Sequence, residues 1–146
     1  MTLMDKLLFL TINIALGSQI TIAQRSSCSL DQQAKAEEET DKLQTWGALY
    51  QSYRRYADCD DGAVAEGYDE VVAKLLRDHW DTLPQFAVLL EKDQRFKTFV
   101  LRHVSLTSLD TNDLRKVGTK AVERCPIGQD NLCKDLRRRV KYDLSQ

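Results

Sequence analysis

Apolar side chains recur at three- and four-residue steps along most of this chain, as expected for helices that each bury one face. The pattern is clearest after Asp41, where six residues share one broad helical face: Leu43, Trp46, Leu49, Tyr50, Tyr53 and Tyr56. The acidic sequence from Ala57 to Gly62 ends this face. Asp60 or Asp61 can cap the following helix, because a carboxylate accepts hydrogen bonds from the free amides of a first turn. We therefore predict one helix up to Tyr56 and a second that runs to about Trp80.

Four further helices are predicted in the second half of the chain. Their start signals lie at Asp81 to Pro84, Asp93, Asp110 or Thr111, and Asp130 or Asn131. Proline is well tolerated in a first turn, and Asp, Asn and Thr are favoured caps. No alternating apolar and polar run predicts a strand. The predicted fold class is all-α, with a single compact domain of about five to six helices over residues 41–146.

The N-terminus has a different pattern. Lys6 precedes an apolar run from Leu7 to Leu16, and the segment then leads through small residues to Ala23. This layout is typical of a secretory signal peptide, and the apolar run is shorter than the roughly 20 residues needed to cross a bilayer. An N-terminal core helix is the alternative. We predict a signal peptide at 1–23 and a periplasmic or secreted protein.

Residues 24–40 separate the predicted signal peptide from the helical domain. The segment is polar and rich in Gln, Glu and Lys. It has almost nothing to bury, so we predict a polar N-terminal arm that is mobile or forms a frayed helical lead-in.

The four cysteines all follow the predicted signal peptide: Cys28, Cys59, Cys125 and Cys133. An even number of cysteines in an exported protein predicts disulfides, here two that staple the helical domain. Zinc is the alternative, but zinc ligands usually come in close pairs that this chain lacks. Three connectivities are possible. Turn residues between Cys125 and Cys133 favour a local bridge there, which leaves Cys28 with Cys59, while a long-range link from Cys59 to the C-terminal cysteines stays open.

Residues able to perform chemistry are few. His79 and His103 belong to no metal-binding or nucleophile motif, and we interpret both as histidines at the core edge. The acidic sequence before Gly62 does not fit a calcium-binding EF-hand loop. Glu66 with Asp69 or Glu70 could form the carboxylate pair of a glycoside hydrolase, although acids this frequent make such a pair uninformative. We expect no enzyme, metal site or cofactor.

Charge is unevenly distributed, although the formal net charge is only −1. Residues 31–70 contain 11 acidic and four basic residues, a net of −7, whereas residues 134–141 contain five basic and one acidic residue, a net of +4. This balance argues against nucleic-acid binding, and no second apolar stretch is long enough to span a membrane. Two solvated faces would explain the asymmetry, or the acidic side could steer a basic partner protein. The candidate partner-binding residues are Asp58, Asp60, Asp61, Glu66 and Tyr56.

The general plan of the chain resembles the small periplasmic immunity proteins that protect bacteria from type VI secreted cell-wall amidases. Four features carry the resemblance: the aromatic helix from Trp46 to Tyr56, the cysteine and acidic turn from Asp58 to Asp61, the following Ala63-Val64-Ala65 helix, and the cysteine pair before a basic end. The resemblance implies an exported helical protein, with a homodimer as one form, that plugs the catalytic groove of a toxin.

Three functions are therefore considered. The first is an exported, non-enzymatic protein-binding or inhibitor protein, with immunity to a secreted cell-wall hydrolase as its specific form. The second is a structural or envelope-associated helical protein without an enzyme target. The third is a small cell-wall hydrolase.

Overall fold

The computed structural model describes residues 27–146, which contain seven α-helices and no strand. The helices are α1 (Leu30–Thr40), α2 (Trp46–Tyr56), α3 (Gly62–Asp78), α4 (Leu83–Lys92), α5 (Gln94–Arg102), α6 (Thr111–Glu123) and α7 (Asp130–Asp143). Two short 3-10 helices precede α3 and α4, namely η1 (Ala57–Cys59) and η2 (Trp80–Thr82). The predicted all-α fold is confirmed for this part of the chain. The predicted signal peptide lies outside the described residues.

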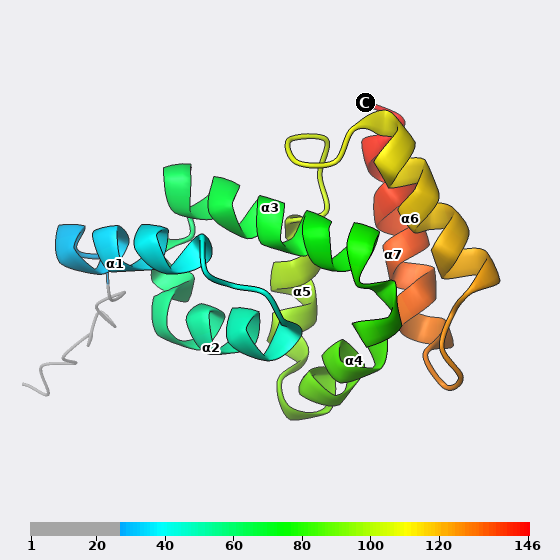
Figure 1. The fold of residues 1–146 in the computed structure, drawn as a ribbon, viewed down its shortest axis with the longest axis horizontal. Coiled ribbons are helices and arrows are strands. Elements are labelled where there is room, and N and C mark those ends of the chain that lie inside the picture. The colour runs from blue at the N-terminus through cyan, green and yellow to red at the C-terminus, as the bar shows by residue number, and fades with distance from the viewer. Residues whose placement is uncertain (1–26) are drawn as a thin grey trace, which may run out of the picture.

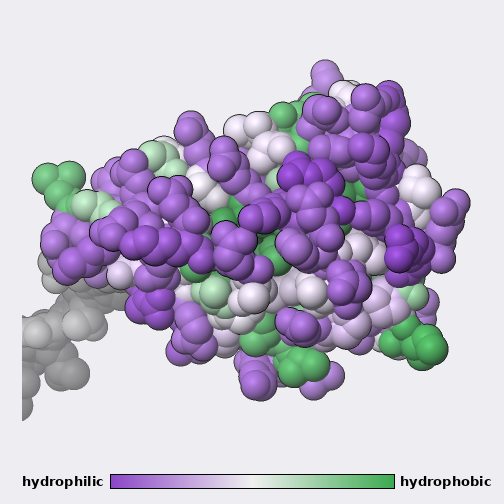
Figure 2. Space-filling view, viewed as in Figure 1, coloured by the Kyte–Doolittle hydropathy of each residue, from purple (hydrophilic) through white to green (hydrophobic). Residues whose placement is uncertain are grey.

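The helices are spread along the long axis of the molecule (Figure 1). α1 and α2 lie at one end, α3 crosses the middle, and α6 and α7 lie side by side at the other end. α4 and α5 connect the two ends beneath and behind α3 in this view. Hydrophilic side chains cover most of the face shown in Figure 2, and hydrophobic atoms are visible there only in small separate patches.

Three helices begin at the aspartates that the sequence predicts as caps. The Asp61 side chain accepts a hydrogen bond from the Gly62 amide at the start of α3. Asp93 accepts from the Arg95 amide at the start of α5, and Asp110 caps α6 in the same way. Each carboxylate satisfies amides that have no partner inside the helix and also faces the positive end of the helix dipole. These helix starts are therefore set by local sequence.

Aromatic rings form the centre of the core between α2, α4 and α5. Trp46 stacks on Phe86 with ring centroids 4.5 Å apart, and Phe96 meets Phe86 edge-to-face at 5.5 Å. Tyr53 packs between Phe96 and Phe99, at 5.2 and 4.8 Å. Such offset and edge-to-face pairs add to the free energy gained by burying the rings. The predicted burial of the aromatic face of α2 is confirmed at Trp46, which is fully buried.

The polar segment predicted as an arm contains a regular helix, α1. Its start is a capping box in which Ser29 and Gln32 bond to each other's backbone amides. Ala36 and Thr40 are buried, and α1 packs on α2 and α3. The buried side of α1 consists of small residues, so the sequence shows no apolar stripe. This contact between small side chains is the physical reason that the segment is ordered without a large apolar face.

Both disulfides connect the cysteines that the turn residues favour. Cys28 bonds Cys59, 31 residues away, and Cys125 bonds Cys133, eight residues away. The first bond ties Cys28, two residues before α1, to η1, and the second closes the turn between α6 and α7. The long-range alternative and the zinc alternative are both wrong, because all four sulfurs are in these two bonds.

We expect Gly67→Ala to lower the free energy of unfolding by about 1–3 kcal/mol, which urea denaturation measures. A Cβ at this position would lie 2.3 Å from Oγ1 of Thr40, so α1 and α3 would have to separate. Gly47→Ala is the matched control, because a Cβ there meets nothing closer than 3.9 Å. The control should stabilise the protein by up to about 1 kcal/mol, since alanine favours helix over glycine. Equal effects of the two substitutions would contradict the close packing of α1 on α3.

Replacing the two disulfides one at a time should give unequal losses. We expect the Cys28→Ser, Cys59→Ser double variant to lose about 1 kcal/mol more than the Cys125→Ser, Cys133→Ser variant, because the longer loop restricts the unfolded chain more. The Cys28–Cys59 bond also anchors the start of α1, so its loss adds to this difference. Chemical denaturation of both variants measures it, and a larger loss from the short loop would contradict the expectation.

Candidate functional site

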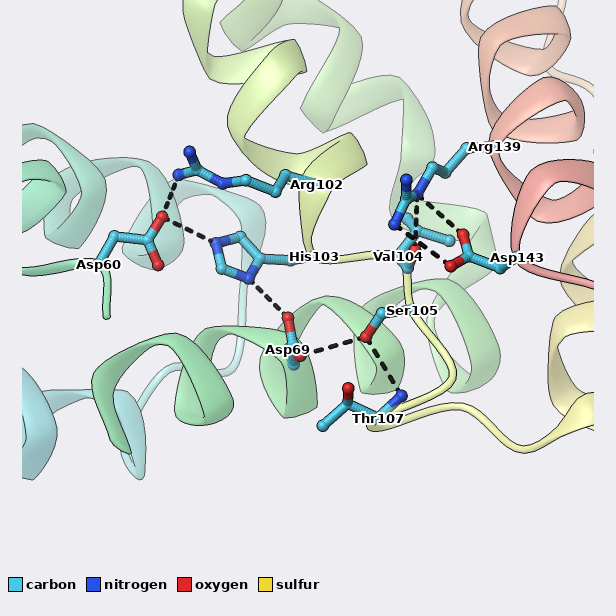
Figure 3. Close-up of polar contacts among 9 residues, drawn as sticks. All are labelled: Asp60, Asp69, Arg102, His103, Val104, Ser105, Thr107, Arg139 and Asp143. Carbon is cyan, nitrogen blue, oxygen red and sulfur yellow. Dashed lines mark hydrogen bonds and ion pairs between the residues drawn. The ribbon is translucent and has the colours of Figure 1, made fainter. Parts of the chain in front are cut away.

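His103, the residue that follows α5, lies at the centre of a cluster of charged side chains (Figure 3). The histidine is only 3 % exposed. Its Nδ1 lies 2.6 Å from Oδ1 of Asp69, and its Nε2 lies 3.2 Å from Oδ2 of Asp60. Both neighbours are carboxylates, which only accept hydrogen bonds when ionised. Both ring nitrogens must then donate, so the geometry fits a protonated imidazolium.

Asp60 reaches the histidine from the turn between η1 and α3. Its side chain is 4 % exposed and also pairs with the guanidinium of Arg102, which is itself largely exposed. A carboxylate buried to this extent is stable only when opposite charges and hydrogen-bond donors surround it. Arg102 and His103 are adjacent in sequence, so the C-terminal end of α5 provides both cations.

Asp69 extends the cluster from α3 to the loop after His103. Its second oxygen accepts a hydrogen bond from Oγ of Ser105, at 3.1 Å. The same hydroxyl accepts a bond from the Thr107 amide at 3.3 Å. The beginning of the 103–110 loop is thereby held against the middle of α3. Tyr68, the neighbour of Asp69, packs its ring 5.7 Å from that of His103.

The charges of the cluster shift its pKa values in opposite directions. Burial lowers the pKa of His103, but its bonds to Asp60 and Asp69 outweigh burial, so the net pKa lies above the ordinary value. Burial raises the pKa of Asp60, but His103 and Arg102 outweigh it and hold the pKa below the ordinary value. Both shifts favour the charged forms, in agreement with the geometry of an imidazolium paired with the Asp60 carboxylate.

The order of groups in this cluster differs from that of a serine nucleophile with its base. In a Ser-His-Asp triad the serine donates to the histidine, which then removes its proton. Here Ser105 donates to Asp69, and both nitrogens of His103 already face carboxylates. The arrangement supports a structural role, in which charge joins η1, α3 and α5.

The Arg139 side chain connects α7 to the same loop. Arg139 donates from Nε to the Val104 carbonyl at 2.9 Å and pairs with Asp143, also at 2.9 Å (Figure 3). Burial raises the pKa of Asp143, and Arg139 partly offsets this effect. The loop that follows His103 is therefore held by α3 on one side and by α7 on the other.

The structure divides the predicted partner-binding residues into two groups. Asp58, Asp61 and Glu66 are exposed, and we call them the acidic rim. Tyr56 is half-buried, with the Arg55 guanidinium 5.6 Å from its ring centre. The prediction that Asp60 binds a partner needs correction. Its carboxylate points inward to His103 and Arg102, so it does not present a surface for a partner.

The structure also places the residues considered for hydrolase chemistry and for metal binding. Asp69, one member of the proposed hydrolase pair, bonds His103 and Ser105, whereas Glu66 and Glu70 are exposed. His79 is exposed at the end of α3. Within residues 27–146, no group of three or more His, Cys, Asp or Glu side chains is placed to hold a metal ion.

Sequence reasoning identified His103 as a histidine at the core edge but missed its partners. Asp69 lies 34 residues away and Asp60 lies 43 residues away, so no local pattern connects them. One signal was present: Asp69 lies three residues before Val72 and seven before Leu76, on the apolar face of α3. A carboxylate on an apolar stripe indicates a buried partner.

Comparisons with protein-family models, with curated proteins and with solved structures found no match to this chain. The two disulfides fit an extracellular or periplasmic protein, because such bonds persist in oxidising compartments. In the part of the chain that the structure describes, no helix has the length and apolar character needed for a membrane crossing.

The stability of the protein should fall as pH rises from the ordinary pKa of histidine through the raised pKa of His103. Because the folded pKa of His103 is raised, its contribution is complete below the unfolded value of about 6.5 and is lost as pH rises through the folded value. The contribution of Asp60 has the opposite sign and is lost only in acid, since its folded pKa is lowered. Urea denaturation at several pH values measures the free energy of unfolding on the acid side and on the alkaline side.

We expect His103→Gln to lose this alkaline decline and to lower the free energy of unfolding by about 3–5 kcal/mol at pH values below about 6.5, because the buried Asp60 and the half-buried Asp69 lose the cation that they share. His79→Gln is the matched control, since His79 is exposed and belongs to no such cluster. The control should keep the decline. A decline that survives in His103→Gln would show that another group causes it.

Proposed function

We propose that this protein is an exported, non-enzymatic binding protein that inhibits a partner with a basic surface. The observation that carries the proposal is the construction of the turn at residues 58–61. Its two inner residues are anchored, Cys59 by a disulfide to Cys28 and Asp60 by its pairs with His103 and Arg102. Its two outer residues, Asp58 and Asp61, are exposed.

Anchoring of this kind favours binding because it lowers the entropy lost on association. A rigid surface does not have to be ordered by its partner, so more of the interaction energy appears as affinity. The Asp61 amide also donates to the Cys59 carbonyl at 2.8 Å, which closes the turn on itself. The acidic rim is thus held in one shape before any partner arrives.

Electrostatics gives the proposed partner its chemistry. Most acidic residues of the region 31–70 lie on α1, in the turns on both sides of α2 and on the first half of α3, toward one end of the molecule, while Asp60 and Asp69 pair with His103. A concentrated negative surface attracts a positively charged protein over a distance comparable with the Debye length and orients it during approach. We infer a partner whose contact surface is rich in Lys and Arg.

The resemblance to periplasmic immunity proteins extends the proposal to a target class. A secreted cell-wall hydrolase would meet this protein in the same oxidising compartment that its disulfides fit. The acidic rim would then cover the entrance to the hydrolase groove. The general plan of the chain supports this target class, and hydrolysis assays of a captured partner test it separately from binding.

The test is affinity capture with the disulfide-bonded protein and two double variants. Asp58→Lys with Glu66→Lys reverses the charge of two of the three rim residues and keeps the Asp61 cap. Glu91→Lys with Glu123→Lys makes the same charge change at exposed positions on α4 and α6. We expect a partner from a periplasmic or secreted extract to bind the wild type and the control. Binding to the rim variant should be at least about tenfold weaker, and the difference should shrink at high salt.

Two results would contradict the proposal. Equal capture by the rim variant and the control would separate binding from the acidic rim. Absence of a specific partner at every salt concentration would contradict binding as the function. Assays of the captured partner for hydrolysis of cell-wall fragments, with and without this protein, decide the target class, and turnover of those fragments by this protein alone would favour the hydrolase alternative.

A further inference from the structure

The hairpin of α6 and α7 carries apolar side chains on its outer face as well as in the core. Val117 and Leu136 are fully buried, but Val122 is 61 % exposed and Leu144 is 37 % exposed. The two exposed side chains line an open groove of about 690 Å³ between the helices. We call it the α6/α7 groove, and its floor consists of Gly118, Val122, Val140 and Leu144.

Gly118, within the floor, allows the two helices to approach each other closely. A Cβ at this position would lie 3.2 Å from Cγ1 of Val140, closer than ordinary packing allows. The valley between the helices is therefore apolar at its base and has the shape that receives another helix, as in helix-in-groove recognition.

The rims of the α6/α7 groove are basic. Arg115 comes from α6, and Arg137 and Lys141 come from α7, one helical turn apart. None of these three forms an ion pair with another residue of the range 27–146. Arg138 and Arg139, on the same helix, pair with Asp135 and Asp143. The positive charge around the groove is therefore not neutralised within the described fold.

We propose that the α6/α7 groove is the docking site for an acidic amphipathic helix of a partner protein. An apolar stripe on that helix would cover Val122 and Leu144, and its flanking Asp and Glu side chains would meet the three basic residues. Uncompensated charge next to exposed apolar area specifies this combination. The site lies at the end of the molecule opposite α1, so it is separate from the acidic rim.

Two other occupants fit the groove less well. A second copy docked groove to groove would bring the basic rims of the two copies together, and like charges at an interface are unfavourable. A bilayer surface is flat on this scale, whereas the floor lies between two helices. A separate acidic helix satisfies both the shape and the charge.

Two synthetic peptides test the proposal directly. Both form helices of about 18 residues with the same leucine stripe, and one carries Glu flanks while the other carries Lys flanks. We expect the Glu peptide to bind saturably and to shift the methyl NMR signals of Val122 and Leu144. Arg137→Glu should weaken this binding by about tenfold at low salt. Lys134→Glu makes the same charge change on α7 outside the groove and should change it less than about twofold.

Other outcomes would overturn the proposal. They are equal binding of the two peptides, equal effects of the two variants, or signal shifts away from the groove. Binding to phosphatidylglycerol vesicles in place of the Glu peptide, lost in Arg137→Glu, would assign the groove to a membrane surface. Concentration-dependent dimerisation lost in the same variant would assign it to a second copy. Asp58→Lys should leave peptide binding unchanged, which separates this site from the acidic rim.

Discussion

The imidazolium of His103 lies between two carboxylates from different parts of the chain, and the shape of the acidic end depends on this arrangement. Asp60 comes from the turn before α3, Asp69 from α3 itself, and the histidine from the end of α5. Each carboxylate would be costly to bury alone, and the shared cation makes both tolerable. Loss of any member therefore affects three elements, and the Cys28–Cys59 bond holds the same turn from the side of α1.

This constraint links the fold to the proposed function. In the sequence, four neighbouring residues at 58–61 form one acidic turn, but the structure gives them different tasks. Cys59 and Asp60 hold the turn in place, and this leaves Asp58 and Asp61 at the surface. The basic residues of the α6/α7 groove lie at the opposite end. The two ends of the molecule thus present opposite charge, and we propose partners of opposite charge for them.

Features set by neighbouring residues could be predicted from the sequence, and features set by distant residues could not. The caps at Asp61, Asp93 and Asp110 follow from local chemistry. The short Cys125–Cys133 bond follows from the turn residues it encloses. α1 was missed as an ordered helix because its contact with α3 uses small side chains. The inward direction of Asp60 was missed because its partner His103 lies 43 residues away. Composition was enough to locate the acidic residues of the rim. The bonds that hold the turn in place are visible only in the structure.

If charge pairing in the core holds the acidic turn rigid, amide hydrogen exchange at Asp61 should depend on Asp60. That amide donates to the Cys59 carbonyl within the turn. In Asp60→Ala, we expect its protection to fall by at least about tenfold relative to wild type, while amides in α6 and α7 keep theirs, because local opening no longer has to break the ion network. Unchanged protection at Asp61 in that variant would show that the turn is rigid without its bond to His103, and would contradict the role of the ion network.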